Sequence, residues 1–94
     1  MITDMLKFTV KEGCADQAKA LMAAQMKANL GDNGCVISKT FQSKTNACDF
    51  YMLLCWENRE AIDAHLETEH DLTFREGLDP ILAGPPEFFE WDEV

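Results

Sequence analysis

The chain has 94 residues, of which 47% are hydrophobic and 27% are charged, and this composition is typical of a folded globular protein rather than a disordered one. A chain of this length is expected to form one domain over residues 1–94, because a second domain would lack a core of its own. Seventeen acidic and eight basic residues give a formal net charge of −9, which repels phosphate backbones and anionic lipids and so excludes nucleic acid and membrane surfaces as expected partners.

The N-terminal segment and the cysteines predict a cytoplasmic protein. Asp4 and Lys7 interrupt the first residues, which therefore lack the basic start and the long apolar run of a secretory signal. The cysteines form no C-x-x-C pair, so they are expected to be reduced thiols rather than disulfides or zinc ligands. They are Cys14, Cys35, Cys48 and Cys55.

The first half of the chain alternates between strand and helix patterns. Apolar and polar residues alternate over residues 5–11, which predicts a strand. From Ala15, apolar residues at three- and four-residue steps predict an amphipathic helix, which the turn-forming residues 31–34 end. Alternation returns over Cys35–Gln42 and predicts a second strand.

Residues 50–56 are apolar at every position, which predicts a central strand that is covered on both faces. In a small α+β domain the helices cover only one face of the sheet. A second subunit is the simplest cover for the other face, and a ligand cavity is an alternative that could share this role. The sequence therefore predicts a homodimer.

The second half begins with Asn58, a good N-cap for a second helix that we expect to end near Gly77. Residues 78–82 are expected to form a short helical turn, and the Gly-Pro-Pro sequence at residues 84–86 precedes a final strand. The resulting order β-α-β-β-α-β predicts an α+β fold of the ferredoxin-like type with an antiparallel sheet. This order alone does not define an activity.

Residues 56–65 read Trp-Glu-Asn-Arg-Glu-Ala-Ile-Asp-Ala-His, and His70 follows. This segment resembles the W-E-x-x-x-A-h-x-x-H…H pattern of antibiotic biosynthesis monooxygenase domains, in which h is apolar. The resemblance implies a dimeric α/β barrel in which two sheets pack face to face and each subunit keeps a small apolar pocket. It also implies oxidation of phenols, quinols or polycyclic aromatic compounds by molecular oxygen, in many members without a flavin or metal.

Oxygen chemistry without a cofactor needs a base to form an electron-rich substrate anion and an apolar pocket to shelter it. The resemblance and the inward position of His65, one helical turn after Ala61, make His65 the expected catalytic base. Burial is expected to keep its imidazole neutral. The alternative is a core histidine that bonds to the backbone or to an acid such as Glu57.

Three further residues are expected substrate-binding candidates. In an unbroken helix His70 lies roughly 140° around the axis from His65, so no shared metal site is expected unless the helix breaks between them. The resemblance implies that no other cofactor is needed. A capping or surface role is the alternative for His70. Trp56 is expected to shape the pocket or to pack in the core, and Tyr51 to donate a hydrogen bond to an oxyanion. Alternation places Trp56 and Tyr51 on opposite faces, so at most one of them lines the pocket.

The sequence therefore predicts a cofactor-independent monooxygenase or related oxidoreductase that acts on a small quinol-like or polyphenolic substrate. Some proteins of the same superfamily degrade haem, and their motif has an asparagine on the first strand. Residues 6–11 contain no asparagine, so haem cleavage is not expected. Two alternatives stay open. One is an isomerase of a small hydroxylated or phosphorylated carbonyl compound, and the other is a dimeric module that binds a ligand without catalysis.

Overall fold

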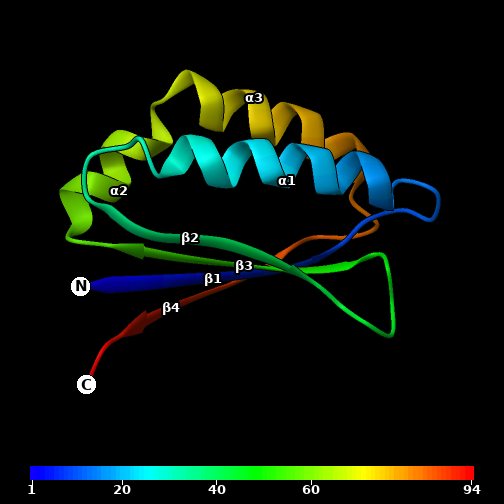
Figure 1. Ribbon diagram of the computed structural model, residues 1–94, viewed down its shortest axis with the longest axis horizontal. Helices are drawn as coiled ribbons and strands as arrows, with labels where there is room; N and C mark the ends of the chain where they lie inside the picture. The colour runs from blue at the N-terminus through cyan, green and yellow to red at the C-terminus, as the bar shows by residue number, and fades with distance from the viewer.

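A computed structural model describes residues 1–94 as a layer of helices packed on a four-stranded antiparallel sheet (Figure 1). The strands are β1 (Ile2–Thr9), β2 (Cys35–Gln42), β3 (Asp49–Trp56) and β4 (Glu87–Asp92). The helices are α1 (Ala15–Asn29), α2 (Arg59–Leu66), α3 (Glu69–Leu78) and the 3-10 turn η1 (Asp79–Ile81). The strand order β2-β3-β1-β4 places β3 and β1 at the centre of the sheet and confirms the predicted ferredoxin-like fold. No helix is long and apolar enough to cross a bilayer.

The core lies between the helices and one face of the sheet. Along β3, every second side chain points to the helices and is at most 5% exposed: Phe50, Met52, Leu54 and Trp56. The inward stripe of α1 meets them with Ala18, Met22 and Met26, which are spaced four residues apart. This spacing places the three side chains on one side of a helix, and their burial is the main force that holds α1 on the sheet.

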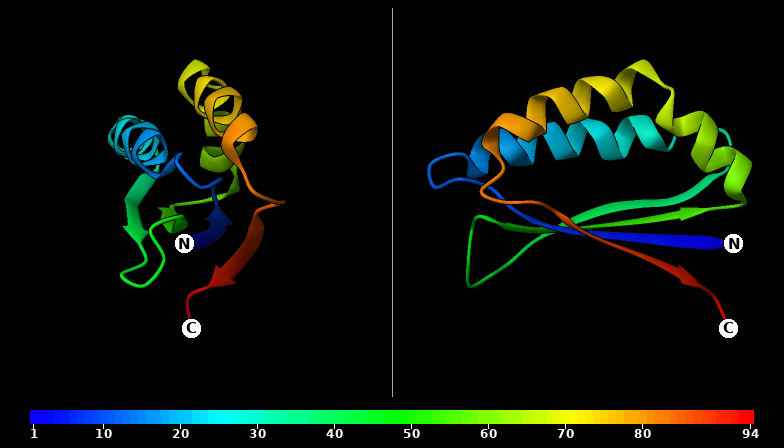
Figure 2. Two further views of the ribbon diagram at one scale, coloured as in Figure 1. Left: turned by 90° about the vertical axis from the view of Figure 1, so that its right-hand side faces the viewer. Right: turned by 180° about the vertical axis from the view of Figure 1, so that it is seen from behind.

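The opposite face of the sheet carries no helix, as both views in Figure 2 show. We call it the helix-free face. Apolar side chains from all four strands gather on it, as the strand register requires: Met5, Ile37, Phe41, Tyr51, Leu53, Phe89 and Trp91. Phe41 and Trp91 are more than half exposed, and the rings of Phe89 and Trp91 stack with centroids 6.3 Å apart. β3 therefore carries apolar side chains on both faces of the sheet, as predicted.

The expected second helix is in fact two helices, and that prediction was wrong. The chain leaves α2 at Glu67 and starts α3 after Thr68. The Thr68 hydroxyl donates to the His65 carbonyl oxygen at 2.7 Å and accepts from the backbone N–H of Asp71 at 3.3 Å. This N-cap begins a new helix, because it satisfies a backbone N–H that would otherwise have no partner.

The turn between α1 and β2 packs tightly against α2 at Gly34. Gly34 has a φ of +85°, and a Cβ atom at this position would lie 2.6 Å from the Cβ of Ala61. The Gly34 carbonyl oxygen also accepts from the backbone N–H of Glu57 at 2.8 Å. Only glycine suits both the backbone conformation and the close approach. The turn, and Asp32 within it, is thereby held beside α2.

Cys35 and Cys55 lie near the ends of β2 and β3. All four cysteines are free thiols. Burial, with smaller contributions from Asp32 and Cys55, raises the pKa of the Cys35 thiol to about 11. A thiol that stays protonated at neutral pH is a poor nucleophile, so Cys35 behaves as a small apolar residue.

Candidate functional site

A cavity of about 370 Å³ lies between the sheet and the helices α2 and α3. Its apolar wall comes from Leu6, Met52, Leu54, Ile62, Phe74 and Phe88. A larger groove of about 590 Å³ runs between α1 and α3, but it is open to solvent and lined by residues such as Ala24 and Ala28. The smaller cavity is the better candidate site, because it is more enclosed and because buried polar side chains converge on it.

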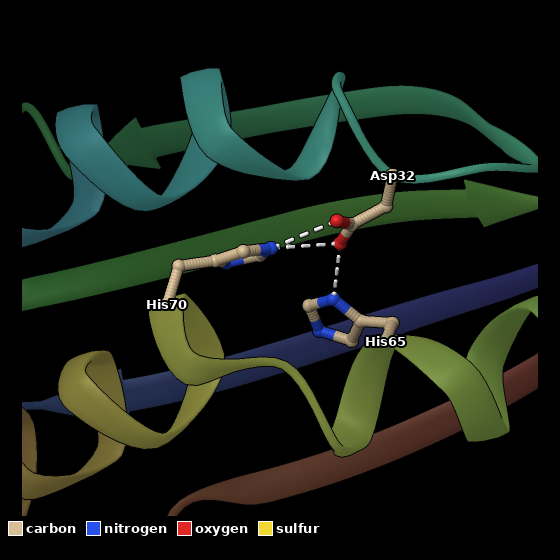
Figure 3. Close-up of side chains that lie close together, drawn as sticks. All are labelled: Asp32, His65 and His70. Atoms are coloured by element: carbon tan, nitrogen blue, oxygen red, sulfur yellow. Dashed lines mark hydrogen bonds and ion pairs between the residues drawn. The ribbon is translucent and has the colours of Figure 1, made fainter.

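His65 lies at the wall of this cavity and is 5% exposed. Its ring packs on Trp56, with centroids 4.7 Å apart. Its Nδ1 atom lies 2.7 Å from Oδ2 of Asp32, and its Nε2 atom lies 3.2 Å from Oδ1 of Asp71 (Figure 3 shows the Asp32 contact). The histidine is therefore held by two acids, and Glu57, the partner considered from the sequence, makes neither contact.

His70 turns toward His65 rather than away from it. Its Nε2 atom lies 2.9 Å from both carboxylate oxygens of Asp32, and the two imidazole centroids are 5.5 Å apart (Figure 3). We call Asp32, His65 and His70 the histidine cluster. The expectation that the two rings do not share a face was wrong, because it assumed an unbroken helix and the chain breaks at Thr68.

The electrostatics of His65 also differ from the expectation. Burial alone lowers its pKa, but hydrogen bonds to Asp71 and Asp32 and the charges of these two acids outweigh burial, so the pKa lies above its usual value. For Asp32, burial raises the pKa, and the hydrogen bonds from His70 and His65 lower it by more, so that carboxylate is readily ionised. Acid partners therefore make His65 a stronger base than burial alone allows.

Asp71 connects the cluster to two further side chains. The Gln25 amide donates to Asp71 Oδ1 at 3.2 Å, and Arg75 Nε lies 3.0 Å from Asp71 Oδ2. The Gln25 carbonyl oxygen lies 3.2 Å from Nδ1 of His70. The two histidines are thus fixed in orientation by groups from α1 and α3.

A second group of polar residues in the cavity wall comes from β1, β4 and α2. Asp4 is 5% exposed and lies opposite Glu90 in the register of β1 and β4. Burial raises the pKa of Asp4 to about 6, and the adjacent Glu90 carboxylate adds to this rise. Arg59 forms an ion pair with Glu90, which keeps the pKa of Glu90 low. Asp4 therefore carries a proton in a pH range where an ordinary aspartate is ionised.

Several buried polar atoms in the cavity wall have no hydrogen-bond partner within the chain. They are Oδ1 of Asp4, both side-chain polar atoms of Asn29 and Nε1 of Trp56. A buried polar atom without a partner costs about 1–3 kcal/mol. The cavity is therefore suited to a small molecule that offers both hydrogen-bond donors and acceptors.

Replacing Asp4 with asparagine should increase the free energy of unfolding by about 1–2 kcal/mol near pH 8 and change it little near pH 4. The pKa of Asp4 is about 6 in the folded chain and 3.8 is its ordinary value, so the folded state holds a proton that the unfolded state loses. The stability from this proton is complete below the unfolded pKa and is lost as the pH rises through the folded pKa. Asparagine avoids this loss because it stays neutral.

Urea unfolding of the Asp4→Asn protein and the parent across this pH range tests the expectation. Asp92→Asn, a change of an exposed acid on β4, is the control. A difference between Asp4→Asn and parent that does not vary with pH would mean that Asp4 titrates normally.

The structure places the four expected site residues in three environments. His65 and Trp56 both line the cavity. His70 belongs to the histidine cluster but lines the groove between α1 and α3. Tyr51 lies on the helix-free face and does not reach the cavity. The fold therefore brings Trp56 and His65 together and separates them from Tyr51, as alternation along β3 predicts.

Comparison with known proteins identifies the family of the chain. The sequence pattern of the antibiotic biosynthesis monooxygenase family matches residues 1–77. The chain therefore belongs to this family, as the motif from Trp56 to His70 indicates. No curated protein matches the chain.

Solved structures share the fold across the whole chain. A proposed antibiotic biosynthesis monooxygenase from Nitrosomonas europaea has a TM-score of 0.95 and 20% identity, with 100% of this chain and 99% of that chain covered. A protein of Deinococcus radiodurans with a similar description has a TM-score of 0.90, 14% identity, and coverage of 100% and 93%. A conserved protein of unknown function from Bacteroides thetaiotaomicron, described as a candidate oxidoreductase, has a TM-score of 0.86, 24% identity, and coverage of 96% of each chain. These identities support a common fold and do not define a substrate.

Proposed function

We infer that this protein is a cofactor-independent monooxygenase of small quinol-like or polyphenolic compounds. The observation that carries this proposal is the position of His65 in the wall of a mostly apolar cavity, where its ring contacts the carboxylates of Asp32 and Asp71. A base and a sheltered apolar space are the two requirements of oxygen chemistry on an activated aromatic substrate. Membership of the monooxygenase family gives independent support.

The reaction begins with transfer of a phenolic proton to Nε2 of His65. Asp32 holds the opposite ring nitrogen at 2.7 Å and stabilises the imidazolium that forms. The resulting phenolate supplies the electrons that reduce oxygen. One oxygen atom enters the ring at a carbon that bore hydrogen, the other leaves as water, and a phenol with a free ring position becomes a quinone. The substrate is the reductant, so the balance needs no other electron donor.

The pKa of His65 sets a compromise for this step. A base with a raised pKa accepts a phenolic proton more readily, but a smaller fraction of it is neutral at a given pH. The acids that raise the pKa of His65 therefore favour proton transfer and move the working range toward alkaline pH. The raised pKa of Asp4 leaves that residue able to donate a hydrogen bond to an oxygen of the substrate below about pH 6.

The shape and polarity of the cavity limit the substrate. A volume of about 370 Å³ is near the lower end for ligand pockets, which favours a compound of one or two fused rings. Nε1 of Trp56 is a donor without a partner, and Asn29 offers both a donor and an acceptor. A flat molecule with oxygen substituents would satisfy these atoms while its rings contact the apolar wall.

The proposed working form is a homodimer that packs two helix-free faces together. Leu53 at the centre of this face is only partly buried in the single chain, and Phe41 and Trp91 at its sides are more than half exposed. An apolar area of this kind on a soluble protein marks an interaction surface. A second copy offers a matching surface, as the twofold symmetry of most homodimers requires.

Oxygen uptake with a panel of naphthols, hydroquinones and polyphenols tests the proposed function. We expect consumption of one oxygen molecule per quinone formed, with no added flavin or metal and in the presence of a chelator. Turnover of a substrate without oxygen consumption would instead support an isomerase. Thermal stabilisation by these compounds without any product would support a binding module that lacks catalysis.

A further inference from the structure

We propose that the histidine cluster is a binding site for a divalent transition-metal ion, and this proposal does not rest on the function inferred above. One ligand atom from each of Asp32, His65 and His70 lies within 4.8 Å of the other two. The contacts to Asp32 are made by Nδ1 of His65 and Nε2 of His70. Two imidazole nitrogens and a carboxylate oxygen are a common donor set for zinc, iron and related ions.

Nδ1 of His70, the ring nitrogen that faces away from Asp32, already has the partner that a metal-bound histidine requires. The amide group of Gln25 donates to Asp71, so its carbonyl oxygen is the atom that faces Nδ1 of His70 at 3.2 Å. A carbonyl oxygen can only accept, and therefore Nδ1 of His70 carries a proton. In the neutral ring, Nε2 then has a lone pair directed at Asp32.

The ring nitrogen of His65 that faces away from Asp32, Nε2, also lies beside an acceptor. Asp71 is paired with Arg75 and accepts a hydrogen bond from the Gln25 amide. Its Oδ1 atom lies 3.2 Å from Nε2 of His65, so in the tautomer that binds a metal through Nδ1 the Nε2–H can donate to Asp71. In that tautomer, Nδ1 has its lone pair directed at Asp32. A metal-bound histidine usually donates the N–H of its other ring nitrogen to a carboxylate or carbonyl group.

With both rings in these tautomers, three electron-rich atoms face one another. Two neutral imidazole nitrogens and the Asp32 carboxylate would repel unless positive charge lies between them. Two extra protons would supply it, at the cost of two imidazolium rings with centroids 5.5 Å apart. One divalent cation supplies the same charge and leaves both rings neutral. The positions of Gln25 and Asp71 suit the tautomers that such an ion needs.

The ligand atoms must shift to admit the ion. Metal bonds of about 2.1 Å place tetrahedral ligand atoms about 3.4 Å apart, whereas the contacts of Asp32 to the two histidines are 2.7 and 2.9 Å. Asp32 is in a turn rather than a helix or strand, which permits such a shift. The Asp32 and His70 side chains are 15% and 28% exposed, so an ion can enter and a water can complete its coordination.

Metal binding and the base role of His65 exclude each other. The ion takes the lone pair of Nδ1, and Nε2 keeps the proton that it donates to Asp71. A His65 in this state cannot accept a proton from a molecule in the cavity. Zinc is therefore expected to inhibit any reaction for which His65 is the base, and a chelator is expected to restore it.

The test is direct binding of metal to chelator-treated protein by titration calorimetry and by the visible spectrum of Co²⁺. We expect about one Zn²⁺ or Co²⁺ per chain and no comparable binding of Mg²⁺, which prefers oxygen ligands. Asp32→Asn and His70→Gln should each weaken Zn²⁺ binding by at least about tenfold. Asp63→Asn, which makes the same change at an exposed acid of α2, should bind as the parent does.

Two results would overturn the proposal. One is parent protein that binds Zn²⁺ no better than Mg²⁺. The other is equal Zn²⁺ affinity in the parent, Asp32→Asn and His70→Gln proteins, above all with a thiolate absorption band from Co²⁺ that assigns the metal to cysteine. Zinc should also raise the melting temperature of the parent more than that of His70→Gln, a readout that needs no substrate and is independent of the oxygenase assay.

Discussion

Replacing His65 with glutamine is expected to lower kcat for oxygen-dependent turnover by roughly 10²- to 10⁴-fold, the usual contribution of a positioned general base. Glutamine has a similar length and can still bond to Asp32 and Asp71, but it cannot accept the substrate proton. Substrate binding should change much less, because the apolar wall of the cavity stays intact. Oxygen uptake and thermal stabilisation by substrate, measured together, separate the two effects.

The matched control for this experiment is Asp63→Asn on the exposed side of the same helix, which should keep the parent rate. All proteins are assayed after chelator treatment, so that metal at the histidine cluster does not affect the comparison. Equal rates for His65→Gln and the parent would remove His65 from the mechanism. A loss of substrate binding equal to the loss of rate would instead assign His65 a role in holding the substrate.

Replacing Leu53 with aspartate should convert the expected dimer to monomers, with a dissociation constant raised by roughly a hundredfold or more, or about 3 kcal/mol. Leu53 is on β3, a central strand, and its side chain points to the middle of the helix-free face. A dimer that packs these faces together would bury the new carboxylates without partners. Sedimentation or light scattering over a dilution series measures the change.

Thr73→Asp adds the same charge on the exposed surface of α3 and should leave the association unchanged. If the parent protein is already monomeric when dilute, with the helix-free face open to water, the proposed dimer is wrong. The Leu53→Asp protein should keep its fold, because Leu53 is outside the core between sheet and helices.

The order of elements was predictable because the first two strands alternate, the third is a continuous apolar run, and the first helix has apolar residues at helical spacing. The break in the second helix was missed, because apolar residues from Ile62 to Phe74 continue at helical spacing across it. A local signal was present: Thr68 with Asp71 three residues later is typical of a helix start. The first strand was also placed too late, and it begins at Ile2 rather than at residue 5.

The site was predictable only in part. The motif identified His65 and Trp56, and alternation separated Trp56 from Tyr51. Asp32 is 33 residues from His65, and nothing local distinguishes it from other acids in polar turns. Asp4 was excluded from the predicted strand, so its pairing with Glu90 was not foreseen. Contacts of this kind depend on which segments meet in space, and one sequence does not reveal them.

The N-cap at Thr68 has a consequence for how histidine spacing is interpreted in this family. Two histidines five residues apart diverge on a continuous helix, yet here a single hydroxyl redirects the chain and the rings converge. Alanine or leucine at this position would favour one long helix and separated rings. One residue that does not line the cavity thus decides whether the two histidines of this chain meet at Asp32.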